Sequence, residues 1–147
     1  MTHKTHKQYL KFTALVIGSF GPIFFLGTML PTSGFAQWTL DFLSYPVDGL
    51  QNYQAATTRF LSALTGGFLF GWGITIWFLQ QWVYDFAPNA VRKTVLAGLL
   101  AWFVLDSAGS LTSANYFNAW FNIIVLLIAA GPLWKPIKQN KTLNYTK

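Results

Sequence analysis

Four apolar stretches, each about 20 residues long, dominate this chain and leave little room for any other fold. They run over residues 9–30, 56–79, 91–111 and 116–134. A helix needs about 20 residues to cross the hydrocarbon core of a bilayer, where the backbone must satisfy its own hydrogen bonds. The sequence therefore predicts an all-α fold: an integral membrane four-helix transmembrane bundle, with residues 1–147 forming a single transmembrane domain.

The composition fits a chain whose surface largely avoids water. Charged residues make up only 10% of the sequence, whereas soluble domains carry about 25%. There is no glutamate and no cysteine, so a disulfide, a thiolate metal site, an iron–sulfur cluster and a cysteine nucleophile are all excluded. The four acidic residues are Asp41, Asp48, Asp85 and Asp106.

The basic residues predict the orientation of the spans. Nine of the ten lie in the N-terminal segment, in the loop after the second span, or in the tail of residues 135–147. Positively charged loops stay on the cytoplasmic side, so we expect both termini to be cytoplasmic. Basic chain ends also indicate contact with anionic lipid headgroups and argue against a nucleic-acid partner. The nine residues are Lys4, Lys7, Lys11, Arg92, Lys93, Lys135, Lys138, Lys141 and Lys147.

The N-terminal 36 residues allow a second interpretation. A basic start, an apolar middle and the sequence Gly34-Phe35-Ala36 resemble a secretory signal with a cleavage site. The apolar run is, however, longer than the usual core of a signal peptide, which is about 7–15 residues. An uncleaved first span is therefore the favoured interpretation.

The longest segment outside the predicted spans carries a regular row of aromatic residues. Phe35, Trp38, Phe42 and Tyr45 recur every three or four positions, which places them on one face of a short helix. We expect this helix in the first outer loop, lying in the membrane interface. The alternative is a lid over the bundle.

Small residues form a stripe along the second span. Ala63, Gly67 and Gly71 recur every fourth position, and Gly98 marks a weaker stripe in the third span. Small residues at this spacing let two helix backbones approach closely. We expect these residues to pack helices within the bundle, with a dimerisation face as the alternative.

Polar residues that could form a site gather toward the outer half of the spans. Asp106 is the one acid within a span, and such residues are functional candidates by default. Arg59 begins the second span on the same side, so we expect an ion pair between them. Asn118 and Asn122 share one face of the fourth span. Together with Ser110, these residues predict a polar pocket.

Two interpretations of this pocket stay open. It either binds a polar headgroup or a small molecule, or its groups satisfy one another and lock the bundle, at about 0.6 kcal/mol for each contact. The inner half is expected to be apolar, with His3 and His6 in a solvated tail. No P-loop, nucleophile elbow or pair of carboxylates is present. We therefore expect no catalytic residue, no metal, no cofactor and no enzymatic activity.

Spans two to four carry a set of short motifs, namely Arg59, Gly66-Gly67, Gly71, Asp106-Ser107-x-Gly109-Ser110, Asn118 and Asn122. Over about residues 56–134, this pattern resembles small bacterial four-span inner-membrane proteins of the DoxX-like kind and related uncharacterised families. The resemblance implies a four-helix bundle in the bacterial inner membrane. Some members of those families are proposed accessory subunits of membrane oxidoreductases, but this chain has no cofactor ligand of its own.

The expected function is that of a non-catalytic accessory or assembly subunit of a larger inner-membrane complex. Such a subunit packs its transmembrane helices against partner subunits or against a second copy. The alternative is a binder or transporter of a lipophilic small molecule or a lipid with a polar head, using the pocket around Arg59 and Asp106. A bound lipid is compatible with either function.

Overall fold

The computed structural model describes residues 2–136, which form helices and no strand. Residues 137–147, the greater part of the predicted basic tail, lie outside the described residues. Three short helical segments adjoin the longer helices: the 3-10 turns η1 (Leu30–Thr32) and η3 (Gly131–Trp134), and the π-helical turn η2 (Leu79–Val83). The longer helices are α1 (His3–Leu26), α2 (Gly34–Leu43), α3 (Ala56–Phe78), α4 (Pro88–Thr112) and α5 (Tyr116–Ala130).

Four helical segments are long and apolar enough to cross a membrane, as the sequence predicted. Three of them begin within three residues of the expected positions, but the first helix begins at His3 rather than at residue 9. Thr2 caps it, because its side chain accepts a hydrogen bond from the backbone N–H of Thr5. Both His3 and His6 therefore lie in α1 rather than in a tail. The expectation that they are solvated was wrong for His6, which is buried, whereas His3 is exposed.

Proline and glycine set several helix boundaries. Pro88 occupies the first turn of α4, where its missing N–H leaves no hydrogen bond unmade. Gly131 ends α5 with a φ of 32°, a backbone conformation that other residues rarely adopt. By contrast, α1 continues through Pro22 as one helix.

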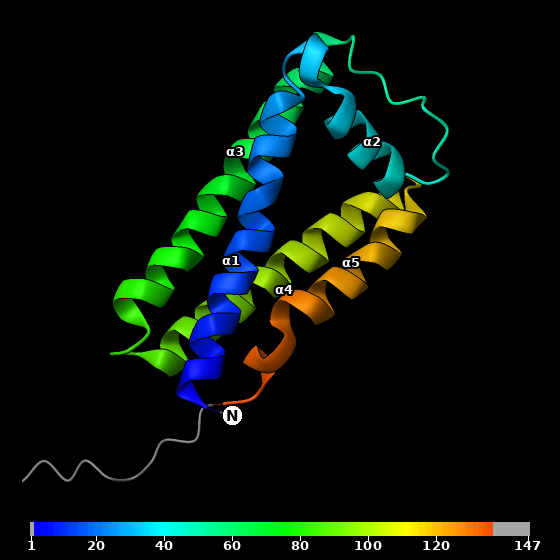
Figure 1. Cartoon of the computed structure of the whole chain (residues 1–147). Helices are drawn as coiled ribbons and strands as arrows, with labels where there is room; N and C mark the ends of the chain where they lie inside the picture. The colour runs from blue at the N-terminus through cyan, green and yellow to red at the C-terminus, as the bar shows by residue number, and fades with distance from the viewer. Residues whose placement is uncertain (1, 137–147) are drawn as a thin grey trace, which may run out of the picture.

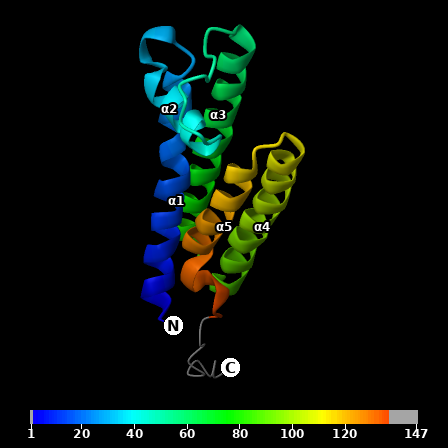
Figure 2. The same ribbon diagram turned by 90° about the vertical axis from the view of Figure 1, so that its right-hand side faces the viewer.

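The four long helices form two antiparallel hairpins rather than one evenly packed bundle. Helix α1 packs against α3, and α4 packs against α5. The hairpins meet at one end and diverge toward the other, where α2 lies between them (Figure 1). Figure 2 shows the N-terminus and the end of α5 together at the first end. We call this the basic end and the opposite one the α2 end.

Glycines bring α1 and α3 into close contact. A Cβ atom at Gly66 would lie 2.8 Å from the carbonyl oxygen of Gly21, and one at Gly73 would lie 2.7 Å from the Cα of Gly18. Ser62, on the same face of α3, donates a hydrogen bond to the carbonyl of Phe24 at 2.7 Å. Small residues therefore fix the spacing of this hairpin.

At the basic end, side chains bind backbone carbonyls at and after the end of α5, both from the first hairpin and from α4. The last carbonyls of a helix lack partners within it. In α5, those of Ile128 and Ala129 accept hydrogen bonds from the hydroxyls of Tyr9 and Thr13 on α1. Arg92 of α4 donates to the carbonyl of Leu133 at 2.9 Å. A buried apolar cluster surrounds these contacts; its largest members include Leu10, Ile76, Tyr84, Leu99 and Leu133.

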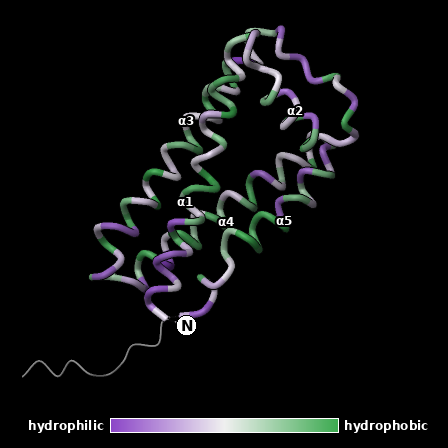
Figure 3. The backbone as a smooth tube through the Cα atoms, in the orientation of Figure 1, coloured by the Kyte–Doolittle hydropathy of each residue, from purple (hydrophilic) through white to green (hydrophobic). Residues whose placement is uncertain are grey.

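The predicted short helix in the first loop is present as α2. Phe35 and Trp38 stack on each other and are exposed, while Phe42 packs edge-on against Phe117 and Phe121 of α5. The helix also contacts α1, so it bridges the two hairpins at the end where they diverge. Hydrophobic residues line the four long helices, and hydrophilic ones gather at the basic end and in the loop after α2 (Figure 3).

Candidate functional site

Four of the five residues predicted to form a polar pocket lie together between α4 and α5. The Oδ2 atom of Asp106 accepts hydrogen bonds from the side-chain amides of Asn118, at 3.0 Å, and Asn122, at 2.6 Å. The amide of Asn118 also donates to the hydroxyl of Ser110 at 2.8 Å. Ser107 completes the group by accepting from Asn122 at 3.2 Å. We call these residues the Asp106 cluster.

The helical repeat places these side chains opposite each other. Asp106 and Ser110 are four residues apart on α4, and Asn118 and Asn122 are four residues apart on α5, so each pair occupies one helix face. The short turn between the helices makes them antiparallel neighbours. Amides of α5 therefore meet oxygen atoms of α4 at matching depths.

The Asp106 cluster largely satisfies its own hydrogen-bonding capacity. Ser110 and Asn122 are buried, and Asp106 and Asn118 are half-buried. Two amide donors converge on a single carboxylate oxygen, which leaves the other one without a side-chain donor from the described residues. The arrangement is well suited to holding α4 against α5, and it leaves the Oδ1 atom of Asp106 able to accept a further hydrogen bond.

Arg59 does not join the cluster. Its Nη1 atom donates to the backbone carbonyls of Tyr53, at 2.9 Å, and Gln54, at 2.6 Å. Within residues 2–136, ion pairs involve Asp85 and not Asp106. The expected ion pair is absent because the two hairpins diverge at the α2 end, which leaves the loop before α3 as the nearer source of acceptors.

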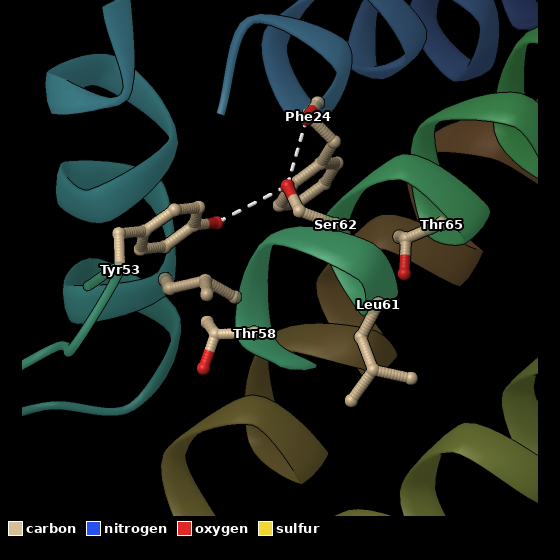
Figure 4. Close-up of a pocket in the computed structure, with 7 residues that line it drawn as sticks. Phe24, Tyr53, Thr58, Leu61, Ser62 and Thr65 are labelled. Atoms are coloured by element: carbon tan, nitrogen blue, oxygen red, sulfur yellow. Dashed lines mark hydrogen bonds between the residues drawn. The ribbon is translucent and has the colours of Figure 1, made fainter. Parts of the chain in front are cut away.

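A pocket of about 210 Å³ lies instead where α1, α2 and α3 meet. Its wall includes the hydroxyl pair Tyr53 and Ser62, whose oxygen atoms are 3.3 Å apart. Figure 4 shows the ring of Tyr53 reaching from the loop to Ser62, which is itself bonded to the carbonyl of Phe24. The pocket is lined by Phe24, Leu40, Tyr53, Thr58, Leu61, Ser62 and Thr65.

The stripe of small residues on α3 lies beside the face that packs against α1, not on it. A Cβ atom at Gly67 or Gly71 would meet nothing within 4 Å, and Ala63 is half-buried. The expectation that these residues pack helices within the bundle was therefore wrong for Gly67 and Gly71. Gly98 is half-buried and would place a Cβ 3.5 Å from the Trp72 ring, an ordinary contact.

The residues that hold the first hairpin together differ from those predicted to pack the helices. Ser62, Gly66 and Gly73 face α1. The first two each lie one position before a residue of the predicted stripe, and Gly73 lies two positions after its last residue. Their spacing of four and then seven residues is also a helical repeat. Gly18 and Gly21 on α1 supplied a second signal, since two helices that approach closely need small residues on both sides.

Polar residues at the basic end were also missed. His6 and Gln80 are 0% and 1% exposed, and Thr13 is 0% exposed. The expectation that the inner half is apolar was therefore wrong. Gln80 and Gln81 lie near the end of the second hydrophobic stretch. A polar pair at this position resembles the residues that commonly stand where a span meets water.

Comparison of the chain with protein-family models, curated proteins and solved structures gave no match.

Proposed function

We propose that this protein is a non-catalytic accessory or assembly subunit of a larger complex in the bacterial inner membrane. One observation carries the proposal: α3 carries two glycines, Gly67 and Gly71, that no other part of the described chain covers. In membranes, such glycines are typical of sites where a second helix packs closely, because backbone atoms of both helices come into contact.

The geometry of α3 supports this assignment. Ser62, Gly66 and Gly73 face α1. Given a rotation of about 100° per residue, Gly67 lies about a third of a turn from this face and Gly71 lies nearly half a turn from it. Open space surrounds both glycines, to at least 4 Å around a Cβ atom. A helix from another subunit can approach here without displacing α1.

Leucine substitutions on this face test the proposal. We expect Gly67→Leu combined with Gly71→Leu to remove copurifying subunits, because the larger side chains hold a neighbouring helix away. The open surroundings predict an unchanged helical content and melting temperature. Native mass spectrometry after gentle detergent extraction measures the subunits that remain bound.

Gly109→Leu is the matched control, since Gly109 on α4 also has nothing within 4 Å of a Cβ atom. It should retain the partner. If the unaltered protein is extracted as a bare monomer, or if the double variant keeps its partners, the proposal is wrong.

A second candidate function is binding of a lipid or another lipophilic molecule with a polar head. The pocket beside Tyr53 favours it, because its lining is mainly apolar and includes the hydroxyls of Thr58, Ser62 and Thr65. Ligand pockets commonly combine an apolar wall with a few polar groups. Leu61→Trp is designed to fill the pocket, so a small molecule retained in native mass spectra should be lost from this variant.

A further inference from the structure

A second pocket, of about 220 Å³, lies between α2 and the loop that follows it. It shares no lining residue with the pocket beside Tyr53. Gln37 and Trp38 lie four and three residues before Asp41 on α2, so they share its side of the helix. A water molecule occupies about 30 Å³ of liquid, so the pocket has room for a group of several heavy atoms. Its wall is completed by Gly34, Gly49 and Gln51.

Asp41 supplies the charged group of this wall and is only 4% exposed. Its two carboxylate oxygens accept hydrogen bonds from the backbone N–H groups of Asp48, at 3.3 Å, and Gly49, at 3.0 Å. These bonds hold the loop against α2 but bring no positive charge, and a carboxylate can accept about four hydrogen bonds. Within residues 2–136, the ion pairs do not include Asp41. A buried carboxylate without a positively charged partner is unfavourable.

The chain around Asp41 offers no cation of its own. Residues 12–58 contain two aspartates and no lysine, arginine or histidine, hence a net charge of −2. Arg59, the next basic residue along the chain, uses its Nη1 atom to bind the carbonyls of Tyr53 and Gln54. The α2 end is therefore locally acidic in a molecule whose net charge is +6, and it attracts a positively charged ligand.

The other groups of the wall indicate which kind of cation fits. Trp38 contributes an indole ring, the aromatic group that attracts cations best. The side-chain amide of Gln37 donates to Ser33 at 3.2 Å, which leaves its carbonyl oxygen free to accept. Ca²⁺ and Mg²⁺ need about six or more oxygen ligands, and residues 2–136 hold no group of three or more His, Cys, Asp or Glu suited to a metal. An aromatic wall is instead typical of sites for substituted ammonium groups.

We propose that this pocket binds a substituted ammonium group, with the Asp41 carboxylate as its counter-ion and the Trp38 ring as one wall. Two sources carry this chemistry: the ethanolamine or choline headgroup of a lipid, and a free amine in solution. The pocket lies at one end of the spans, where lipid headgroups are found. The proposal is independent of the subunit contact at Gly67 and Gly71, which lie on α3.

Titration with choline chloride tests the proposal on the full-length protein in a neutral detergent, with sodium chloride keeping the ionic strength constant. We expect saturable binding by calorimetry. Asp41→Asn should weaken it at least about tenfold, and Trp38→Leu about 3–30-fold, because they remove the counter-ion and the ring. Matched controls are Asp48→Asn, in the same loop, and Trp120→Leu, since Trp120 on α5 is 68% exposed. Both should bind choline as the unaltered protein does.

A second variant covers the case in which Asp41→Asn disturbs the loop. Gly34 lines the pocket, and a Cβ atom there meets nothing within 4 Å. Gly34→Leu should therefore fill the pocket without a clash and abolish binding. Choline binding that survives both Gly34→Leu and Asp41→Asn would overturn the proposal. The Gly67→Leu, Gly71→Leu variant should still bind choline, so failure of the proposed subunit role leaves this result standing.

A lipid arm separates the two sources. If free choline does not bind, native mass spectra of protein from nanodiscs that contain equal phosphatidylethanolamine and phosphatidylglycerol decide. Preferential retention of phosphatidylethanolamine that Asp41→Asn and Gly34→Leu both lose would identify a lipid headgroup. Saturable binding of choline would identify a free amine as sufficient. Neither choline binding nor a preference for phosphatidylethanolamine would refute the proposal.

Discussion

At the scale of single residues, Gly131 connects the end of α5 to the first hairpin. Its φ of 32° disfavours any side chain, and a Cβ atom there would collide with the hydroxyl group of Tyr9. That hydroxyl donates to the carbonyl of Ile128, one of the contacts that hold the hairpins together. One glycine thus permits both the end of the helix and the contact between hairpins.

We expect Gly131→Ala to destabilise the fold by about 1–3 kcal/mol, through backbone strain and displacement of Tyr9. Unfolding by titration with a denaturing detergent measures the loss. Gly34→Ala is the control, because a Cβ at Gly34 meets nothing within 4 Å. Equal stability of the two variants would contradict the role given to Gly131.

The Asp106 cluster makes a second prediction at this scale. Asp106→Leu removes the acceptor of two side-chain amides and should cost about 1 kcal/mol, since polar contacts between membrane helices average about 0.6 kcal/mol each. Asp106→Asn keeps an oxygen acceptor and should lose less. The same detergent titration compares the variants, and no loss in either would show that the cluster does not hold α4 against α5.

These residues also show what sequence could predict about the site. Asp106, Asn118 and Asn122 were expected together, because periodicity and a short turn fix the register of α4 against α5. The partner of Arg59 could not be predicted in this way, because it depends on how far the hairpins diverge, and no local pattern encodes that separation.

At the scale of elements, the start of α1 is tied to the segment after η2 through Asp85. Its carboxylate binds Lys7 and also His3, at 2.8 Å. Hydrogen bonds from Lys7 and then from His3 hold the pKa of Asp85 below its usual 3.8. A carboxyl with a lowered pKa in the folded state stabilises the fold above 3.8, and this contribution disappears as the pH falls through the lower, folded value.

We therefore expect the melting temperature of the unaltered protein to fall more steeply than that of Asp85→Asn as the pH drops below 3.8. The effect should be small and weaker at high salt, because the pair is exposed to solvent. Thermal unfolding across this pH range measures the difference. Asp48→Asn serves as the control, and parallel curves for all three proteins would count against a role for Asp85.

At the scale of the whole molecule, the sequence predicted four spans and their order because apolar length alone determines both. It did not predict the divergence of the hairpins, because the divergence depends on which glycine-containing helix faces pack against each other.

One expectation at this scale still awaits a test, namely that the basic end is cytoplasmic. The chain has no cysteine, so a single introduced cysteine reports its own accessibility.

We expect an impermeant maleimide to label Leu50→Cys on intact cells, since Leu50 lies in the loop after α2 and is 77% exposed. Lys4→Cys, at the exposed start of the basic end, should be labelled only after permeabilisation. Charge asymmetry of the loops is the physical reason for this orientation. The reverse labelling pattern would show that the protein is inserted the other way round.

The spans differ in length, and this difference has a consequence for the lipid around them. The segment Ala56–Val83 has 28 residues and Tyr116–Trp134 has 19, which correspond to about 42 Å and about 28 Å of helix. A hydrocarbon core is about 30 Å thick. A bilayer that matches Tyr116–Trp134 is therefore too thin for an upright Ala56–Val83, and the longer segment must tilt or thicken the lipid beside it. If the longer segment stands upright in a bilayer, we expect the lipid beside it to be thicker than the lipid beside the shorter one, and a thicker membrane to relieve that difference.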